Sequence, residues 1–132
     1  MRDRLAIVLA VGVVMSAPVF AHHGSAAFDN GKTVVLKGTV TQWVYSNPHC
    51  LLTLDVKGED GRVVQWIAET QAPNIMYPAG YRKNSFNIGD AVTVTVEPVK
   101  NGSPIGRIRE VVLANGTTLG GIGAAPIPPK AQ

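Results

Sequence analysis

The segment Thr33-Val-Val-Leu-Lys-Gly-Thr-Val-Thr-Gln-Trp-Val44 decides the fold of this 132-residue chain. Apolar side chains at positions 34, 36 and 40 alternate with polar ones at 37, 39 and 41, which is typical of a long β-strand with one buried face. Gly38 lies in the middle of this strand, where a residue without a side chain allows a bulge or a sharp bend. A single bent strand of this kind can belong to two sheets at once.

Four further segments show strand alternation, and turn signals such as Asp60-Gly61 separate them. Residues 70–88 lack alternation, and Pro73 predicts a helical turn within 72–77. Three strands, a short helical connection and two more strands are the order of an OB-like barrel. The fold class is therefore all-β, a small five-stranded OB-like barrel, with a small β-sandwich as the alternative. The later strands are predicted at His49–Val56, Arg62–Glu69, Ala91–Glu97 and Ile105–Leu113, with a short further strand after Asn115-Gly116.

Cys50 is the only cysteine, so the chain cannot form an internal disulfide. In the second predicted strand Cys50 is in register with Leu52 and the other core residues, which predicts a buried and unreactive thiol. His49, one position earlier, is expected to point away from that core. Trp66 is assigned to the core of the third strand, and the alternation of the fifth strand slips around Arg107, which indicates a bulge.

The first residues have the features of a signal peptide. The apolar run Leu5–Phe20 follows a basic start, and Val19-Phe20-Ala21 matches the small-x-Ala pattern cut by signal peptidase. An uncleaved anchor is the competing interpretation, but the run is shorter than the ~20 residues that span a bilayer and contains Pro18. Cleavage after Ala21 predicts a periplasmic or secreted bacterial protein that makes no membrane contact. The predicted divisions are a signal peptide (1–21), an N-terminal arm (22–32), a β-barrel domain (33–119) and a flexible C-terminal tail (120–132).

Composition and motifs exclude several classes of function. Cleavage would remove Arg2, Asp3 and Arg4 and lower the formal charge from +3 to +2, too small a bias for a nucleic-acid-binding protein. We find no nucleophile elbow, zincin spacing, phosphate loop or pair of catalytic carboxylates in the sequence. The chain is therefore predicted not to be an enzyme, with an oxidative copper enzyme as the one enzymatic alternative.

Several short motifs span the mature chain: Ala21-His22-His23, Phe28-Asp29, Gly38-Thr39-Val40, Asn47-Pro48-His49, Trp66 with Glu69, and Gly89-Asp90 followed by alternating valines. Together they resemble a family of small exported bacterial proteins of unknown function. The resemblance implies export and a shared fold over the mature chain, but it implies no activity. This chain departs from the family pattern in two places, since Gly24 separates the paired histidines from Ser25 and Cys50 is peculiar to this member.

Cleavage after Ala21 would make His22 the N-terminal residue, followed at once by His23. A terminal histidine offers two nitrogen ligands, its α-amine and its ring Nδ1, which together close a six-membered chelate on a metal ion. With the one other histidine of the mature chain, His49, this set resembles the histidine brace of secreted copper monooxygenases and some periplasmic copper carriers. Nitrogen ligands in a plane suit copper(II). We therefore predict a transition metal as the cofactor, copper first, carried or sensed through His22 with His49 or His23 as the third nitrogen ligand.

Geometry sets a condition on this copper site. The first strand separates the N-terminal arm from His49 by up to ~36 Å, so the arm must fold back or the strand must curve strongly. Glu69 and Asp29 are candidates for a carboxylate that orients an imidazole from outside the ligand set. The competing interpretations are a hydrophilic start that assists signal processing, and a His49 with a purely structural role at its turn.

A second hypothesis is a periplasmic module that binds a small ligand or a protein partner without metal. Its open face would lie near the helical connection. The residues predicted for this face are Trp43, Tyr45, Tyr77 and Tyr81. The two hypotheses differ in one property, because metal binding depends on a free amine at His22 and partner binding does not.

Overall fold

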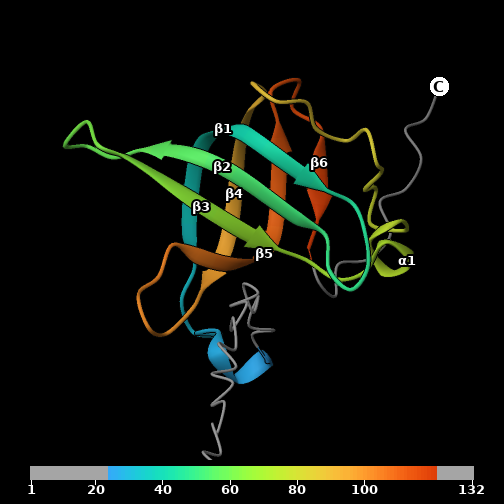
Figure 1. Ribbon diagram of the computed structural model, residues 1–132, viewed down its shortest axis with the longest axis horizontal. Coiled ribbons are helices and arrows are strands. Elements are labelled where there is room, and N and C mark those ends of the chain that lie inside the picture. Colours follow the sequence, from blue (N-terminus) through green and yellow to red (C-terminus); the bar gives the residue numbers. More distant parts are fainter. Residues whose placement is uncertain (1–23, 122–132) are drawn as a thin grey trace, which may run out of the picture.

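The computed structural model describes residues 24–121, which are almost entirely β-structure (Figure 1). A 3₁₀ turn, η1, precedes the first strand, and a single short helix, α1, lies between the third and fourth strands as the sequence predicts. The elements are η1 (Ser25–Ala27), β1 (Val34–Val44), β2 (Leu51–Lys57), β3 (Val63–Glu69), α1 (Pro73–Met76), β4 (Ala91–Pro98), β5 (Ile105–Leu113) and β6 (Thr118–Gly120). Within residues 24–121 no helix is long and apolar enough to cross a membrane.

The strands form one sheet that closes on itself. Their order is β3-β2-β1-β4-β5-β6, and every neighbouring pair in this order is antiparallel. The closure is a parallel pairing between the end of β3 and the start of β5, which aligns Ile67 with Ile105 and Glu69 with Arg107. Strands β1 to β5 therefore make a closed mixed barrel, which confirms the predicted OB-like architecture and excludes the two-sheet sandwich.

Strand β1 is shared between the two halves of the barrel, and Figure 1 shows it curving around the molecule. Residues 34–39 pair with β4, and residues 38–44 pair with β2. A Cβ atom on Gly38 would lie 2.6 Å from the carbonyl oxygen of Asp55, so the strand must have glycine where β2 approaches it most closely. The bulge of this strand lies at Thr41, between Val40 and Gln42, and the pairing at Gly38 is regular. Of the two roles that the sequence allows for Gly38, a bulge or a bend, the bulge is therefore not found there.

The fifth strand has the irregularity that its sequence predicts. Thr95 of β4 pairs with Glu110, whereas the next residue, Val96, pairs with Ile108, so Arg109 is the extra residue of a bulge. Three residues earlier, β5 lies between β4 and β3 at Gly106. A Cβ atom there would lie 2.7 Å from the Cβ of Val96, so the three strands can meet only around a glycine.

The interior of the barrel is apolar. Cys50 has no exposed surface and lies in the core, as its register with the leucines of β2 predicts, and Trp66 is packed against that core. Burial raises the pKa of the Cys50 thiol. The side chains that fill the core come from all six strands and from the segment after α1, and the largest of them are Tyr81, Leu52, Leu54, Met76 and Ile108.

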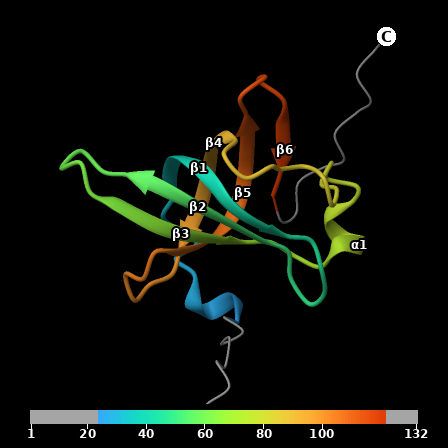
Figure 2. The same cartoon turned by 45° about the horizontal axis from the view of Figure 1, so that its top comes forward.

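The described part of the N-terminal arm lies at the end of the barrel where β4 passes into β5 (Figure 2). Phe28 forms an isolated antiparallel bridge with Val99 and is 3 % exposed. The bridge is secured on both sides, because the amide of Asp29 donates to the carbonyl of Pro98 at 2.9 Å and the amide of Lys100 donates to the carbonyl of Ala27 at 2.9 Å. The arm is therefore attached to the barrel well before β1 begins.

Candidate functional site

His49 is held in a defined orientation just before β2. Its Nδ1 lies 2.8 Å from the carbonyl oxygen of Thr70 and 3.3 Å from Oε1 of Glu69. A carbonyl oxygen can only accept a hydrogen bond, so Nδ1 must carry the proton. In the neutral ring the lone pair then resides on Nε2, the nitrogen through which such a histidine binds a metal. The His49 side chain is 31 % exposed and that of Glu69 is 13 % exposed, so the pair lies at the surface with Glu69 the more enclosed.

The β2–β3 ladder continues past the strand ends and fixes this arrangement. Leu51 pairs with Glu69, the amide of Thr70 donates to the carbonyl of Cys50 at 3.0 Å, and the amide of Cys50 donates to the carbonyl of Gln71 at 3.0 Å. The hydroxyl of Thr70 is buried and reaches the carbonyl of Cys50 at 3.2 Å. The carbonyl oxygen that accepts from His49 therefore belongs to a backbone segment that several hydrogen bonds hold in one conformation.

Barrel closure lines up side chains from four strands on the outer face. Leu51 of β2 pairs with Glu69 of β3, Glu69 pairs with Arg107 of β5, and Arg107 pairs with Glu97 of β4. Because paired residues share a face of the sheet, these four side chains form one row across the closure. The row places the His49–Glu69 pair one strand away from Arg107.

Arg107 joins the N-terminal arm to this row. Its Nε donates to Oε2 of Glu97 at 2.9 Å, and its Nη2 donates to the same carboxylate and to Oδ1 of Asn30, the latter at 2.9 Å. The guanidinium carbon also lies 5.0 Å from the centre of the Phe28 ring. The side chains of Glu97 and Arg107 are only 7 % and 16 % exposed, so this is a largely buried ion pair.

Sequence reasoning did not identify Arg107 and Glu97 as a pair. A signal was present, because Glu97 ends a valine-rich strand and Arg107 begins an apolar one, and a charge in such a position needs a partner. The partner could not be chosen from the sequence, since the register of β4 on β5, with its bulge at Arg109, decides that these two residues meet.

The structure describes only some of the predicted metal ligands. His22 and His23 lie outside residues 24–121, whereas His49 and Glu69 are brought together. Asp29 is not part of this group, because its Oδ1 accepts from the amide of Gly31 at 3.2 Å in an exposed turn. Within residues 24–121 no three His, Cys, Asp or Glu side chains are grouped to hold a metal ion.

The aromatic residues predicted to form an open binding face have a structural role in the main. Tyr81 is fully buried and burial raises its pKa, so its place in an exposed face was a wrong prediction. Trp43 donates from Nε1 to the carbonyl of Arg82 at 3.0 Å, and the hydroxyl of Tyr45 lies 3.2 Å from the carbonyl of Tyr81. These bonds join the segment after α1 to β1. Of the four, Tyr77 is strongly exposed, at 56 %, and the guanidinium of Arg82 stacks on its ring at 3.5 Å.

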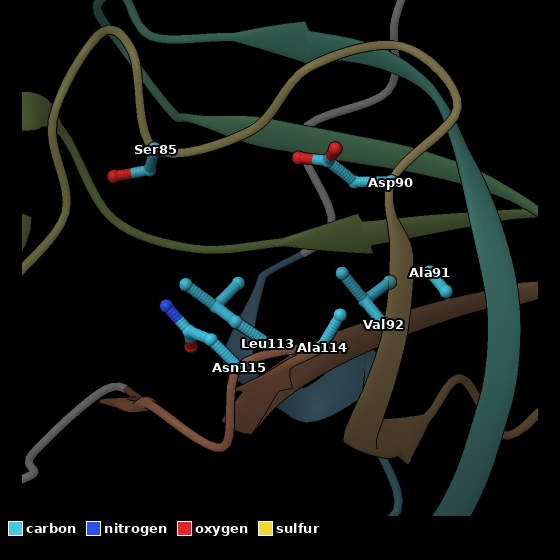
Figure 3. Close-up of a pocket in the computed structure, with 7 residues that line it drawn as sticks. All are labelled: Ser85, Asp90, Ala91, Val92, Leu113, Ala114 and Asn115. Atoms are coloured by element: carbon cyan, nitrogen blue, oxygen red, sulfur yellow. The ribbon is translucent and has the colours of Figure 1, made fainter.

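A shallow pocket of about 280 Å³ opens elsewhere, between the loop before β4 and the end of β5 (Figure 3). Its polar groups are used within the loop, because Oγ of Ser85 accepts from the amide of Arg82 at 2.7 Å and Oδ2 of Asp90 accepts from the amide of Asn87 at 2.8 Å. No predicted site residue lines it. The lining residues are Ser85, Asp90, Ala91, Val92, Leu113, Ala114 and Asn115.

Comparison with known proteins identifies a family but no activity. No curated protein and no solved structure matches the chain. One family model matches residues 10–108, which include the arm, the His49–Glu69 pair, Glu97 and Arg107. The chain therefore belongs to a family of unknown function (DUF6152).

Proposed function

We propose that the mature protein begins at His22 and binds copper(II) through its N-terminus, with His49 as the distant third nitrogen ligand. The α-amine and Nδ1 of His22 supply the chelate, and Nε2 of His49 completes the set. His23 is the alternative third ligand. The protein acts in the periplasm as a copper carrier or sensor and does not turn over a substrate.

The observation that carries this proposal is the hydrogen bonding of His49. Metal-binding histidines usually donate their second ring N–H to a backbone carbonyl or a carboxylate, which fixes the tautomer and the ring plane. Nδ1 of His49 is within reach of both kinds of acceptor, the carbonyl of Thr70 at 2.8 Å and Glu69 at 3.3 Å. The negative charge of Glu69 beside the ring also favours a bound cation.

The attachment of the arm supports the proposal on the condition of distance. The arm does not have to run back along β1, because closure of β3 onto β5 brings the His49–Glu69 pair within a strand of Arg107. Arg107 contacts Phe28 and Asn30 of the arm. Neighbouring strands are ~4.8 Å apart. The turn η1 takes up Ser25–Ala27, so the proposal requires the residues before η1 to extend past Arg107 and Glu69 to His49.

The first test concerns processing. Mass spectrometry of protein purified from the periplasm should give the mass of a chain starting at His22, because Val19-Phe20-Ala21 is the best cleavage pattern in the leader. An intact leader, or a start at Gly24, would remove the chelating amine and refute the proposal.

The second test is a copper(II) titration of correctly processed protein with electron spin resonance recorded at each step. His49→Ala should weaken binding and change the spectrum, and one extra residue before His22 should do at least as much damage because it moves the amine away. Cys50→Ala is the matched control, since it alters the residue next to His49 but affects only the core.

Two other results would identify a different function. If only the added residue weakens binding, the site is a simple terminal chelate and His49 is structural. If neither change matters, the paired histidines are a feature of processing, and the metal-free binding module becomes the better hypothesis. Its probe would then be the exposed Tyr77 beside α1.

A further inference from the structure

The buried ion pair at the barrel closure has no role in the chemistry proposed above. A buried ion pair seldom stabilises a fold more than apolar residues of the same size would, because both charges lose their hydration. Here the guanidinium of Arg107 also contacts a third segment, through Nη2 to Oδ1 of Asn30 and through its stacking on Phe28. Glu97 holds the guanidinium in place from β4. The arrangement is that of a clamp, with two strands holding the arm.

We propose that Arg107 is a positioning residue that clamps the N-terminal arm and thereby keeps the mature N-terminus within reach of His49. This inference rests on the proposed copper site for its function, but the clamp itself is a property of residues 24–121 that can be measured without metal. Arg107 contacts the arm at Asn30 and Phe28.

The clamp determines the length of the tether, which is the segment that joins the terminal amine to the nearest fixed residue of the barrel. With Phe28 fixed, six residues separate the terminal amine from the nearest fixed point of the barrel. With Phe28 released, the nearest fixed point is the start of β1 at Val34, and the tether becomes twelve residues long. The effective concentration of a tethered ligand falls at least as the −3/2 power of tether length. Doubling the tether should therefore weaken the three-nitrogen copper site roughly threefold to tenfold.

The experiment compares variants that open the clamp with one that does not. Phe28→Leu combined with Asn30→Ala removes the side-chain contacts of the arm with Arg107, so that only the backbone bridge to Val99 holds the arm, and it leaves the Glu97 ion pair intact. Arg107→Lys keeps the charge beside Glu97 but loses the planar fork that reaches two partners at once. Arg109→Lys is the matched control, because Nε of Arg109 lies 3.6 Å from Oε1 of the same Glu97 carboxylate and, within residues 24–121, it makes no hydrogen bond or ion pair with the arm.

Hydrogen exchange reports on the clamp directly. The amides of Asp29 and Lys100 form the bridge between the arm and the β4–β5 connection, and they should exchange roughly tenfold faster in both clamp variants. In Arg109→Lys their exchange should be unchanged. Unchanged exchange in the clamp variants would overturn the inference whatever the copper data show.

Copper titration then tests the positioning. Both clamp variants should bind copper(II) about threefold to tenfold more weakly than the unmodified protein, and Arg109→Lys should bind normally. In a His49→Ala background the clamp variants should cause no further loss, because the terminal chelate alone does not depend on where the arm lies. Normal copper binding in the clamp variants, alongside weakened binding in His49→Ala, would overturn the positioning role.

Failure of the proposed copper site gives a different pattern. His49→Ala would then leave binding unchanged, and the positioning role would be refuted with it. Faster exchange of Asp29 and Lys100 in the clamp variants would still establish Arg107 as the residue that holds the arm.

Discussion

His49 and Cys50 are neighbours in the chain, yet their side chains enter opposite environments. Cys50 has no exposed surface and packs with Leu52 inside the barrel, whereas His49 lies at the surface against Glu69. The same contrast holds one strand away, where Ala68 is buried and Glu69 faces outward. The inner face of these strand ends is apolar, and the outer face carries the polar pair His49 and Glu69.

Adjacent residues of the chain are therefore expected to have different roles, one in the stability of the core and the other in the proposed copper site. Substitutions on the inner face should change the free energy of unfolding and leave copper binding unchanged, and substitutions on the outer face should do the reverse. The predictions below test one face or the other, and the first compares a residue of each.

The largest effect is expected from the two adjacent leucines of β2. Leu52→Ala should lower the free energy of unfolding by about 3–5 kcal/mol, because Leu52 is fully buried and its truncation leaves a cavity in the core. Leu51→Ala, on the half-buried outer face, should cost about 1 kcal/mol. Urea unfolding followed by tryptophan fluorescence measures both. Equal losses would mean that the two faces do not differ in their contribution to stability.

Glu69→Gln tests the outer face alone. The amide oxygen can still accept from Nδ1 of His49, but the negative charge beside the ring is lost. Copper(II) affinity should therefore fall by up to about tenfold, or about 1.4 kcal/mol, which is less than the loss in His49→Ala. The midpoint of urea unfolding should move little. A titration in which Glu69→Gln binds copper as tightly as the unmodified protein would remove Glu69 from the site.

Cys50→Ala tests the inner face beside it. Losing one buried sulfur atom should cost about 1 kcal/mol without changing copper binding. The native thiol should react slowly with alkylating reagents, since it is buried and its raised pKa leaves little thiolate at neutral pH. Rapid labelling under native conditions would contradict the register of β2.

Tyr81→Phe should have the smallest effect at neutral pH. The Tyr81 hydroxyl is buried and has no hydrogen-bond partner among the described residues. Removing it should therefore leave stability unchanged or raise it by up to about 1 kcal/mol. A loss above about 1 kcal/mol would show that a partner satisfies this hydroxyl.

The buried Cys50 thiol and Tyr81 phenol should make the protein less stable at alkaline pH. Burial raises the pKa of both the Cys50 thiol and the Tyr81 phenol in the folded state, so above pH ~8.5 the folded protein binds more protons than the unfolded chain. The contribution of these two groups to the free energy of unfolding is fully present below that pH and is lost as the pH rises through their folded-state pKa values. Cys50→Ala should remove the part of the fall that begins near pH ~8.5, and Tyr81→Phe the part that begins near pH ~10.

Local pattern alone determined the strands and the core of this protein. Alternation with a period of two is a property of neighbouring residues, so it placed β1, β5, the buried Cys50 and the bulge near Arg107 without knowledge of the fold. Element order was enough to predict the barrel, and the residue types were enough to select His49 and Glu69. The sequence left open whether Gly38 serves a bulge or a bend, because it does not tell a glycine needed for close approach from one needed for a bulge, and the bulge of β1 lies at Thr41.

Only the tertiary structure decided which groups meet. The closure of β3 onto β5 joins segments far apart in the chain and sets Glu69 beside Arg107, whereas Arg107 meets Glu97 in the β4–β5 pairing. The arm binds through Phe28 to Val99 in the β4–β5 connection, and Arg107 contacts the Phe28 ring. Tyr81 was misplaced for the related reason that its burial depends on how the segment after α1 packs against β1. Such contacts depend on geometry that no local period encodes, because they form between residues whose separation in sequence says nothing of their distance in space.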